Sequence, residues 1–383
     1  MRVSAVLLLL LALPLAAETY YPPPGHWATV SPASLNVHEQ KLADAVAYAI
    51  ASENPASKDQ AIVQATTFGA KEPYDQIIGP MGVRAAANGL IIYRGKLIAQ
   101  WGDVDSVDMT HSIAKTFLTT VTGLAWQRGL IHDLQDRVGP YMPHGVDLYQ
   151  GEHNSQIRWD HLLRQTSDWQ GTLWGKPDWA DRPEGNTPAE WPNRPLRTPG
   201  SHYKYNDVRI NLLALSTLYV WRKPLPEVLN EHIMQPIGAS STWRWYGYDN
   251  SWIELDGQRI QSVSGGGHWG GGIFINAWDL ARFGYLFLRD GQWQGQQLVS
   301  REWINLASSA GVNPEYGFAN WFLNPGRKAL PSAPESAITF QGAGRNIIYI
   351  DRENDLLLVA RWLGNGDELN QLVAKVLAAL PKR

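Results

Sequence analysis

The hydrophobic positions near the start of the chain predict a helix followed by a β-hairpin. In SLNVHEQKLADAVAYAIASEN, apolar residues recur from Leu35 to Ile50 at the three- and four-residue spacing of an amphipathic helix. In ANGLIIYRGKLIAQWGD, two runs of large apolar residues flank Arg94 and Gly95. Two such runs around a short turn are typical of a hairpin.

The other end of the chain carries a matching pattern. NIIYIDRENDLLLVARW has the polar turn DREND between two apolar runs, and DELNQLVAKVLAAL follows with helical spacing. From residue 112 to about 240 the spacing is mostly helical, interrupted by a long loop rich in Trp, Pro and Gly. The pattern predicts an α+β fold, in which an antiparallel sheet from both chain ends is flanked by helices and a helical lobe, at about 112–260, is inserted.

The first residues have a pattern of their own. Arg2 precedes an apolar run from about Val3 to Leu15, and the small residue Ala17 follows. This is typical of a secretory signal peptide, and the run is shorter than a membrane span needs. We expect cleavage after Ala17, a single mature domain over 18–383, and export to the periplasm or the cell exterior. An uncleaved anchor is the alternative.

Composition narrows the classes of function. The chain has 383 residues, of which 44% are hydrophobic and 18% charged, and its 33 basic residues nearly balance 36 acidic ones. Without long like-charged runs, we expect a small-molecule partner and neither nucleic acid nor an anionic membrane surface. Cysteine is absent, which excludes disulfides, thiolate ligands and a cysteine nucleophile. The ten histidines show no metal-ligand spacing, so we expect neither metal nor cofactor.

The segment DMTHSIAKTFLTTVTGLAW sets Ser112 and Lys115 three residues apart at the head of an apolar-periodic run. On a helix these residues face the same side, so the lysine amine can reach the serine hydroxyl. Amides at a helix N-terminus also stabilise developing negative charge, and the arrangement suits acyl transfer. The motif is short, however, and a second S-x-x-K occurs at Ser201 and Lys204.

Four further blocks follow in order: IRWDHLLRQTSDW, TPGSHYKYNDVRINLLAL with Tyr205, SGGGHWGGGIFINAW, and FQGAGRNIIYIDREND. From about residue 35 onward the chain resembles the serine β-lactamase-related superfamily. The resemblance is to the branch shared by class C β-lactamases, family VIII carboxylesterases, D-aminopeptidases and 6-aminohexanoate-dimer hydrolases. It implies that Ser112 attacks the acyl carbon, that Lys115 shares its proton, and that Tyr205 protonates the leaving group.

The chemistry of these residue types is consistent with those roles. A serine hydroxyl needs a base to remove its proton, and no Asp–His triad is evident. Lysine is a base only when neutral, which burial favours, whereas a nearby cation favours ionised tyrosine. Lys115 and Tyr205 therefore titrate as a coupled pair, and which of them holds the proton stays open.

Two departures from the family pattern concern the substrate. The usual Y-S-N or Y-A-N is Tyr205-Asn206-Asp207 here, and a carboxylate only accepts hydrogen bonds, so recognition of a substrate amide is in doubt. Asp207 either pairs with Lys115 or caps the following helix. In β-lactamases a Lys or His of the K-T-G or H-x-G strand faces the substrate carboxylate, and the corresponding segment here, QGAGRN, has neither residue. Arg345 either replaces that cation or is solvated. We expect the second oxyanion donor at the N–H of Gly344 or Arg345.

Two other candidates have open roles. Gly265 to Gly270 match G-x-G-x-x-G, but a predicted strand follows, which argues against a dinucleotide site. The glycines instead favour close passage of the chain beside the site, where His268 either lines the pocket or occupies a tight turn. Trp169, in the long loop, either caps the pocket or fastens the loop to the core.

The sequence thus predicts an exported, cofactor-free serine hydrolase that cleaves carboxylic esters or small amides through an acyl-enzyme on Ser112. One alternative is a β-lactamase or D-amino acid peptidase acting on cell-wall substrates. Another is a catalytically silent protein of the same fold that binds a ligand. A third is a glycosidase using two carboxylates among Asp178, Asp181 and Glu184.

Overall fold

A five-stranded antiparallel sheet joins the two ends of the chain, as the sequence predicts. The computed structural model describes residues 19–382, so the predicted signal peptide lies outside the described residues. The strand order is β11-β12-β13-β1-β2, and β1 from the N-terminal part pairs with β13 from the C-terminal part. The strands are β1 (Asn88–Tyr93), β2 (Lys96–Trp101), β11 (Ile338–Gly342), β12 (Asn346–Asp351) and β13 (Leu356–Arg361).

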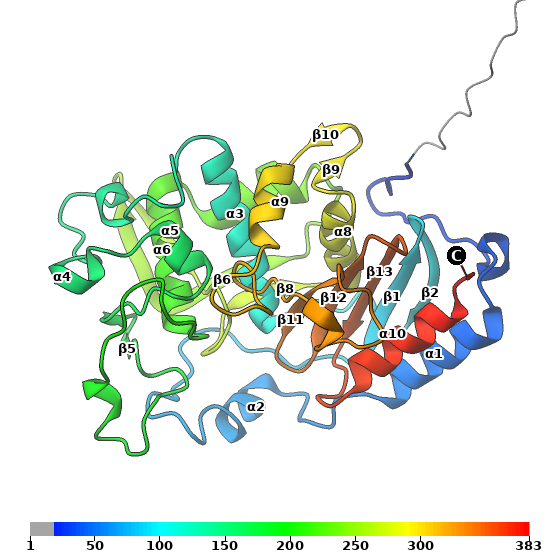
Figure 1. The fold of residues 1–383 in the computed structure, drawn as a ribbon, viewed down its shortest axis with the longest axis horizontal. Coiled ribbons are helices and arrows are strands. Elements are labelled where there is room, and N and C mark those ends of the chain that lie inside the picture. The colour runs from blue at the N-terminus through cyan, green and yellow to red at the C-terminus, as the bar shows by residue number, and fades with distance from the viewer. Residues whose placement is uncertain (1–18, 383) are drawn as a thin grey trace, which may run out of the picture.

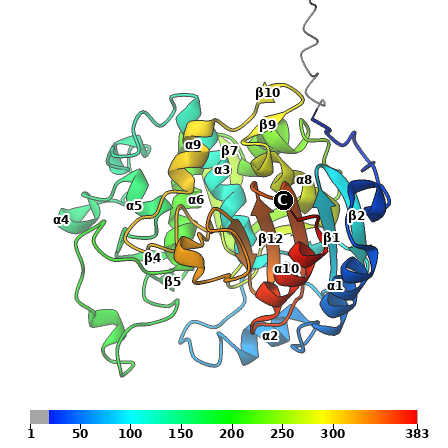
Figure 2. The same ribbon diagram turned by 45° about the vertical axis from the view of Figure 1, so that its right-hand side comes forward.

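Helices cover both faces of this sheet (Figures 1 and 2). Ile347 and Tyr349 of β12 point into a core shared with α1 (Glu39–Ala51) and α10 (Glu368–Ala379). Ile348, between them, points into the main core with α8 (Ala277–Leu288). Because successive strand residues face opposite sides, a strand covered on both faces must be apolar throughout, and the run NIIYI is.

The helical part is built around α3 (Ala114–Gln127), of which twelve successive residues from Ala114 to Ala125 are buried. It packs against α6 (Asp207–Trp221), where Thr122 Oγ1 and Thr217 Oγ1 lie 3.0 Å apart. The lobe also contains the short helices α4 (Gly151–Asn154), α5 (Trp159–Leu163) and α7 (Leu225–Leu229) and the strand pair β4 (Thr172–Leu173) and β5 (Lys176–Pro177).

A second sheet links the two parts, with strand order β3-β8-β6-β7. The sequence predicts β8 (Gly272–Ile275) from IFINAW, but it does not predict the long strand β6 (Arg244–Leu255) or β7 (Gln258–Val263). The register of β6 on β7 shifts between Gly247 and Trp252, and that irregularity breaks the alternation of buried and exposed residues that would identify a strand. The first strand of this sheet, β3 (Asp108–Met109), leads directly to Ser112.

The remaining elements lie at the periphery. They are α2 (Gln60–Thr66), β9 (Gln292–Trp293), β10 (Gln296–Gln297) and α9 (Arg301–Ala307). Within residues 19–382, no helix combines the length and apolar character that crossing a membrane requires.

Candidate active site

Ser112 lies in a single turn of 3-10 helix, His111–Ile113, between β3 and α3. The turn is anchored from several directions: Thr110 Oγ1 donates to Ile273 O of β8 at 3.0 Å, and the buried Arg361 donates to Met109 O at 3.0 Å. His111 has a left-handed backbone, with φ of +50°, and its Nε2 lies 2.9 Å from Gln60 Oε1. These contacts hold the hydroxyl of Ser112, which is half-buried, at the start of a rigid helix.

The structure brings together the three residues that the sequence predicts as catalytic. Lys115 Nζ lies 2.8 Å from Ser112 Oγ, and Tyr205 OH lies 2.6 Å from the same oxygen. Tyr205 reaches this place from the segment just before α6, although it is 93 residues from Ser112 in the chain. The serine oxygen therefore has a lysine and a tyrosine as immediate hydrogen-bond partners.

Asp207 forms a buried ion pair with Lys115. Its Oδ1 lies 2.8 Å from Lys115 Nζ, and the two side chains are 2% and 0% exposed. Burial by itself would lower the pKa of Lys115, but the charges of Asp207 and Tyr205 outweigh burial and raise it. Burial would likewise raise the pKa of Asp207, but Lys115, and after it His268 and Arg182, hold it well below its usual range. Lys115 is therefore an ammonium ion beside the serine.

The alternative role of Asp207 as a helix cap is wrong. The N-cap of α6 is Asn206, whose side chain accepts from the Arg209 N–H at 3.0 Å, and Asp207 is the first residue inside the helix. Because Asn206 accepts the hydrogen bond from the first turn of the helix, both carboxylate oxygens of Asp207 are available to pair with Lys115 and Arg182.

Arg182 is a member of the cluster that sequence reasoning missed. Its Nη1 lies 3.5 Å from Asp207 Oδ2 and also pairs with Asp181, and its guanidinium lies 4.9 Å from the Tyr205 ring centroid. The side chain remains 37% exposed. It lies in the long irregular loop, 25 residues before Asp207, and no local pattern distinguishes it from the other arginines there.

The glycine-rich segment after β7 passes directly over the ion pair, as the sequence suggests. A Cβ on Gly266 would lie 1.6 Å from Asp207 Oδ1 and 2.4 Å from Lys115 Nζ. No side chain fits there, so glycine is required for this close approach.

His268 does not face an open pocket. It is buried, and its Nε2 lies 2.6 Å from Glu72 Oε2 and 3.8 Å from Asp181 Oδ1. These three residues offer possible metal-ligand atoms within 4.8 Å of one another. A metal ion would have to compete with Arg182 and the Asp207 N–H, each of which already bonds one Asp181 oxygen. The contacts explain the cluster as an ion-pair network beneath Arg182.

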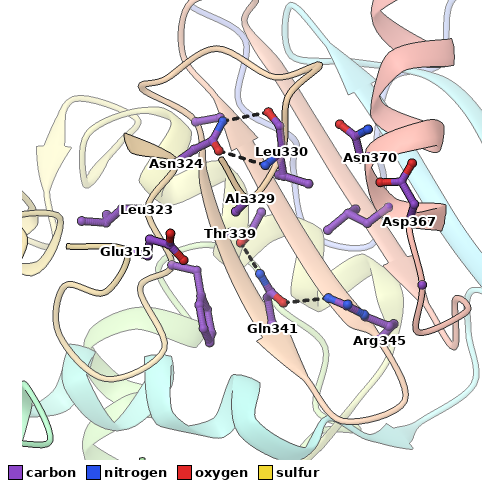
Figure 3. A pocket seen from close by; sticks show the side chains of 14 residues that line it. Glu315, Leu323, Asn324, Ala329, Leu330, Thr339, Gln341, Arg345, Asp367 and Asn370 are labelled. Carbon is purple, nitrogen blue, oxygen red and sulfur yellow. Dashed lines mark hydrogen bonds between the residues drawn. The ribbon is translucent and has the colours of Figure 1, made fainter. Parts of the chain in front are cut away.

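The end of β11 lies against the serine turn. A Cβ on Gly342 would lie 2.0 Å from Thr110 O, and the turn of residues 343–345 follows at once. Arg345 is directed away along this turn: its guanidinium bonds Gln341 Oε1 and Asn365 O, each at 3.2 Å. It lines a cavity of about 230 Å³ beside β11 and the start of α10, where Glu315 and Asp367 also lie (Figure 3).

The Trp-rich loop is fastened to the helical part by buried contacts. Trp169 is 2% exposed and donates from Nε1 to Leu148 O at 2.6 Å, and Arg194 bridges Asp168 and Asp178. Trp169 thus packs in the core. Two of the carboxylates considered for a glycosidase form ion pairs: Asp178 pairs with Arg194, and Asp181 pairs with Arg182.

Comparison with solved structures shows the same fold at low sequence identity. A β-lactamase/D-alanine carboxypeptidase from Pseudomonas syringae aligns with a TM-score of 0.55 and 15% identity, over 84% of this chain and 100% of that one. A penicillin-binding protein homologue from Caulobacter crescentus gives 0.56 and 13%, over 84% and 98%. EstCE1, a hydrolase with promiscuous acyltransferase activity, gives 0.56 and 18%, over 89% and 99%.

The sequence comparisons identify the family. Among curated proteins no sequence matches this chain. The family described as Beta-lactamase matches residues 75–379, which is most of the chain and includes Ser112, Lys115, Tyr205 and the sheet against which they lie. The chain therefore belongs to the beta-lactamase family and has its fold.

Proposed function

We propose that this protein is a serine hydrolase that cleaves carboxylic esters or small amides through an acyl-enzyme on Ser112. The observation that carries the proposal is the position of Ser112 Oγ, within hydrogen-bond distance of both Lys115 Nζ and Tyr205 OH. A half-buried serine with a proton acceptor and a cation at its oxygen is equipped for nucleophilic attack.

The ion pair with Asp207 decides how the proton moves. Lys115, kept as ammonium, has no lone pair to accept the serine proton, so we assign the role of base to Tyr205, whose oxygen lies 2.6 Å from Ser112 Oγ. Lys115 and Arg182 both face the Tyr205 ring, at 4.6 and 4.9 Å, and place two positive charges beside the residue that exchanges the proton. Tyr205 takes the proton as Ser112 attacks, then gives it to the leaving alcohol or amine. Water, activated in the same way, releases the acid.

The oxyanion has two backbone donors at hand. Within residues 19–382, the N–H groups of Ser112, Ala343, Gly344 and Arg345 all have no protein acceptor, so position has to choose among the last three. The contact of Gly342 with Thr110 O brings Ala343 beside the serine turn. It favours Ala343, one residue before the expected Gly344 or Arg345, as the second donor.

Charge at the site favours uncharged acyl groups. Each cation near Ser112 already has a carboxylate partner, and the Arg345 guanidinium bonds Gln341 and Asn365. A β-lactam carboxylate would therefore meet no uncompensated cation there. Together with the predicted signal peptide, this supports an exported esterase or amidase whose helical lobe, at about 112–260, forms one wall of the site.

Intact mass and turnover test this function together. Mature protein and Ser112→Ala are each mixed with phenyl acetate, a chromogenic cephalosporin and a fluorophosphonate probe, and Ser201→Ala serves as the matched control. We expect phosphonate labelling and ester turnover in the wild type and in Ser201→Ala, and neither in Ser112→Ala. Turnover that survives Ser112→Ala would reject the acyl-enzyme, and faster cleavage of the cephalosporin than of the ester would establish a β-lactamase instead.

A further inference from the structure

A second cavity lies between the turn after α2 and the long loop that precedes Tyr205. Its volume is about 620 Å³, and its lining includes Phe68, Lys71, Arg182 and Trp191. Small-molecule sites are commonly about 300–1,000 Å³. The cavity is therefore large enough for part of a substrate.

Arg182 connects this cavity to the reacting serine. Its side chain is part of the cavity wall, and its guanidinium lies 4.9 Å from the ring centroid of Tyr205. The phenolic oxygen of Tyr205 lies 2.6 Å from Ser112 Oγ. In the proposed reaction Tyr205 protonates the leaving group, so that group must lie on the same side of the ester carbon as Tyr205. Because Arg182 both lines the cavity and faces the Tyr205 ring, the cavity adjoins Tyr205.

The apolar part of the lining consists of two aromatic residues, Phe68 and Trp191, and Pro183. The ring of Phe68 meets His268 edge to face, with centroids 4.6 Å apart, and lies 5.0 Å from the Arg182 guanidinium. Its position is thus set by the buried His268 on one side and by Arg182 on the other. Trp191, half-buried, donates from Nε1 to Gly185 O at 3.3 Å. Aromatic walls favour a flat ring as a ligand, because rings gain from edge-to-face and offset contacts beyond the area that they bury.

The charged groups in the lining differ in how they are compensated. Arg182 pairs with Asp181 and Asp207, and Glu72 pairs with His268. Lys71 is exposed, and among residues 19–382 it has no ion-pair partner. An anionic substituent at the cavity mouth would therefore find a cation free to receive it.

We propose that this cavity binds the leaving group of the substrate, and that this group is an aromatic alcohol or amine, preferably with an acidic substituent. The inference rests on the serine-hydrolase function proposed above and adds the class of leaving group. Phe68 and Trp191 hold the ring, and Lys71 attracts the acid.

Three acetate esters test the leaving-group site: butyl acetate, benzyl acetate and 4-(acetoxymethyl)benzoate. Their leaving groups are primary alcohols, and all three form the same acetyl-enzyme, so differences in kcat/KM report acylation and leaving-group binding. For the wild type we expect kcat/KM to rise in the order butyl, benzyl and carboxybenzyl, with about tenfold between the first and the last.

Two variants assign the preference to the cavity. Trp191→Ala is expected to lower kcat/KM for benzyl acetate about fivefold and to leave butyl acetate within about twofold. The matched control is Trp252→Ala, on the exposed surface of β6. Lys71→Glu is expected to lower kcat/KM for the carboxybenzyl ester about tenfold at low salt and to spare benzyl acetate. Its control is Lys328→Glu, at another exposed position.

The outcomes separate this inference from the function on which it rests. If Ser112 is acetylated by all three esters at equal kcat/KM, or if Trp191→Ala slows butyl and benzyl acetate equally, the aromatic leaving-group site is wrong and the serine hydrolase stands. If none of the esters acetylates Ser112, as read by intact mass, both proposals are overturned. Both proposals are supported if the wild type and the two control variants show the expected order of esters, and if Trp191→Ala and Lys71→Glu each lose the preference assigned to that residue.

Discussion

The chain contains two S-x-x-K motifs, and their surroundings differ. Ser112 and Lys115 lie at the start of a buried helix, with Nζ and Oγ 2.8 Å apart. Ser201, in a loop, is exposed and donates to Thr198 O at 2.7 Å, while Lys204 Nζ lies 3.7 Å from Glu184 Oε1. Residues three apart face one another on a helix and not in an irregular loop, so the same spacing produces a pair in one place only.

The two lysines also differ in how they titrate. Both are buried, which lowers the pKa of an amine. At Lys204 burial prevails over Glu184 and the pKa is lowered, whereas at Lys115 the contact with Asp207 reverses the direction. A carboxylate at 2.8 Å, itself buried, interacts more strongly than one at 3.7 Å that is 33% exposed. The comparison shows that the partner determines the direction in which the pKa of a buried lysine shifts.

Replacing each serine should give the largest difference between the two motifs. Ser112→Ala removes the proposed nucleophile and is expected to lower kcat for an activated ester by about 10⁴-fold or more. Ser201→Ala should leave kcat within about twofold. Steady-state hydrolysis of phenyl acetate measures both, and a comparable loss in the two variants would contradict the assignment.

The second largest effect on the reaction is expected from replacing Tyr205. Tyr205→Phe is expected to lower the acylation rate by about 10²–10⁴-fold, because it removes the proposed base and leaves the ring. Tyr203→Phe is its matched control, two residues away. Single-turnover kinetics followed by mass spectrometry report acylation directly, and a Tyr205→Phe variant with full rate would exclude the phenol from the mechanism.

Replacing each of the two lysines should also change the stability of the protein by different amounts. Lys115→Met leaves Asp207 buried without its main partner and is expected to reduce the free energy of unfolding by about 3–5 kcal/mol. Lys204→Met should be close to neutral, because that lysine is buried with only a weak partner. Urea unfolding followed by tryptophan fluorescence measures both. Adding Asp207→Leu to Lys115→Met should recover part of the loss, and no recovery would contradict the ion-pair explanation.

The pH profile sharpens the role of Asp207. The proposed mechanism needs Lys115 as ammonium, so the activity of the wild type should fall as pH rises through the raised pKa of Lys115. Asp207→Asn removes the carboxylate that raises this pKa, and the alkaline limb of kcat/KM should move to lower pH by about 1–3 units. An unchanged limb would show that Lys115 is not the group whose deprotonation ends activity.

The smallest effect is expected at Glu184. Its side chain is 33% exposed, so Glu184→Gln should change the free energy of unfolding by no more than about 1 kcal/mol. Ester turnover should remain within about twofold. A large loss of turnover would give the second motif a functional role that its geometry does not suggest.

Much of the fold could be predicted because it rests on short-range patterns. The hairpin at Arg94 and Gly95 and the DREND turn separate apolar runs of strand length, and both form as expected. The strand β6 was missed because its bulge between Gly247 and Trp252 interrupts the two-residue period. A sheet whose alternation is broken carries no simple signal in one sequence.

The sequence predicted some residues of the candidate site and missed others, again according to whether they belong to a local pattern. Ser112, Lys115 and Tyr205 belong to local motifs, and the structure places them together. Arg182 and Glu72 belong to irregular segments, and they join the site through Asp181, Asp207 and His268. Nothing in the spacing of a loop indicates which of its charges will be buried.

The sequence alone determined the local geometry: a serine and a lysine three residues apart on a helix, and a tyrosine before another helix. The tertiary structure decided which S-x-x-K forms a contacting pair, and that Asp207 compensates the charge of Lys115. The contact of Lys115 with Asp207 joins residues 92 positions apart, and that of Ser112 with Tyr205 joins residues 93 positions apart. Both depend on the packing of α3 against α6 and on the space left by Gly266. Local spacing fixes direction along one element, whereas the charge of a buried group depends on whatever packing brings beside it.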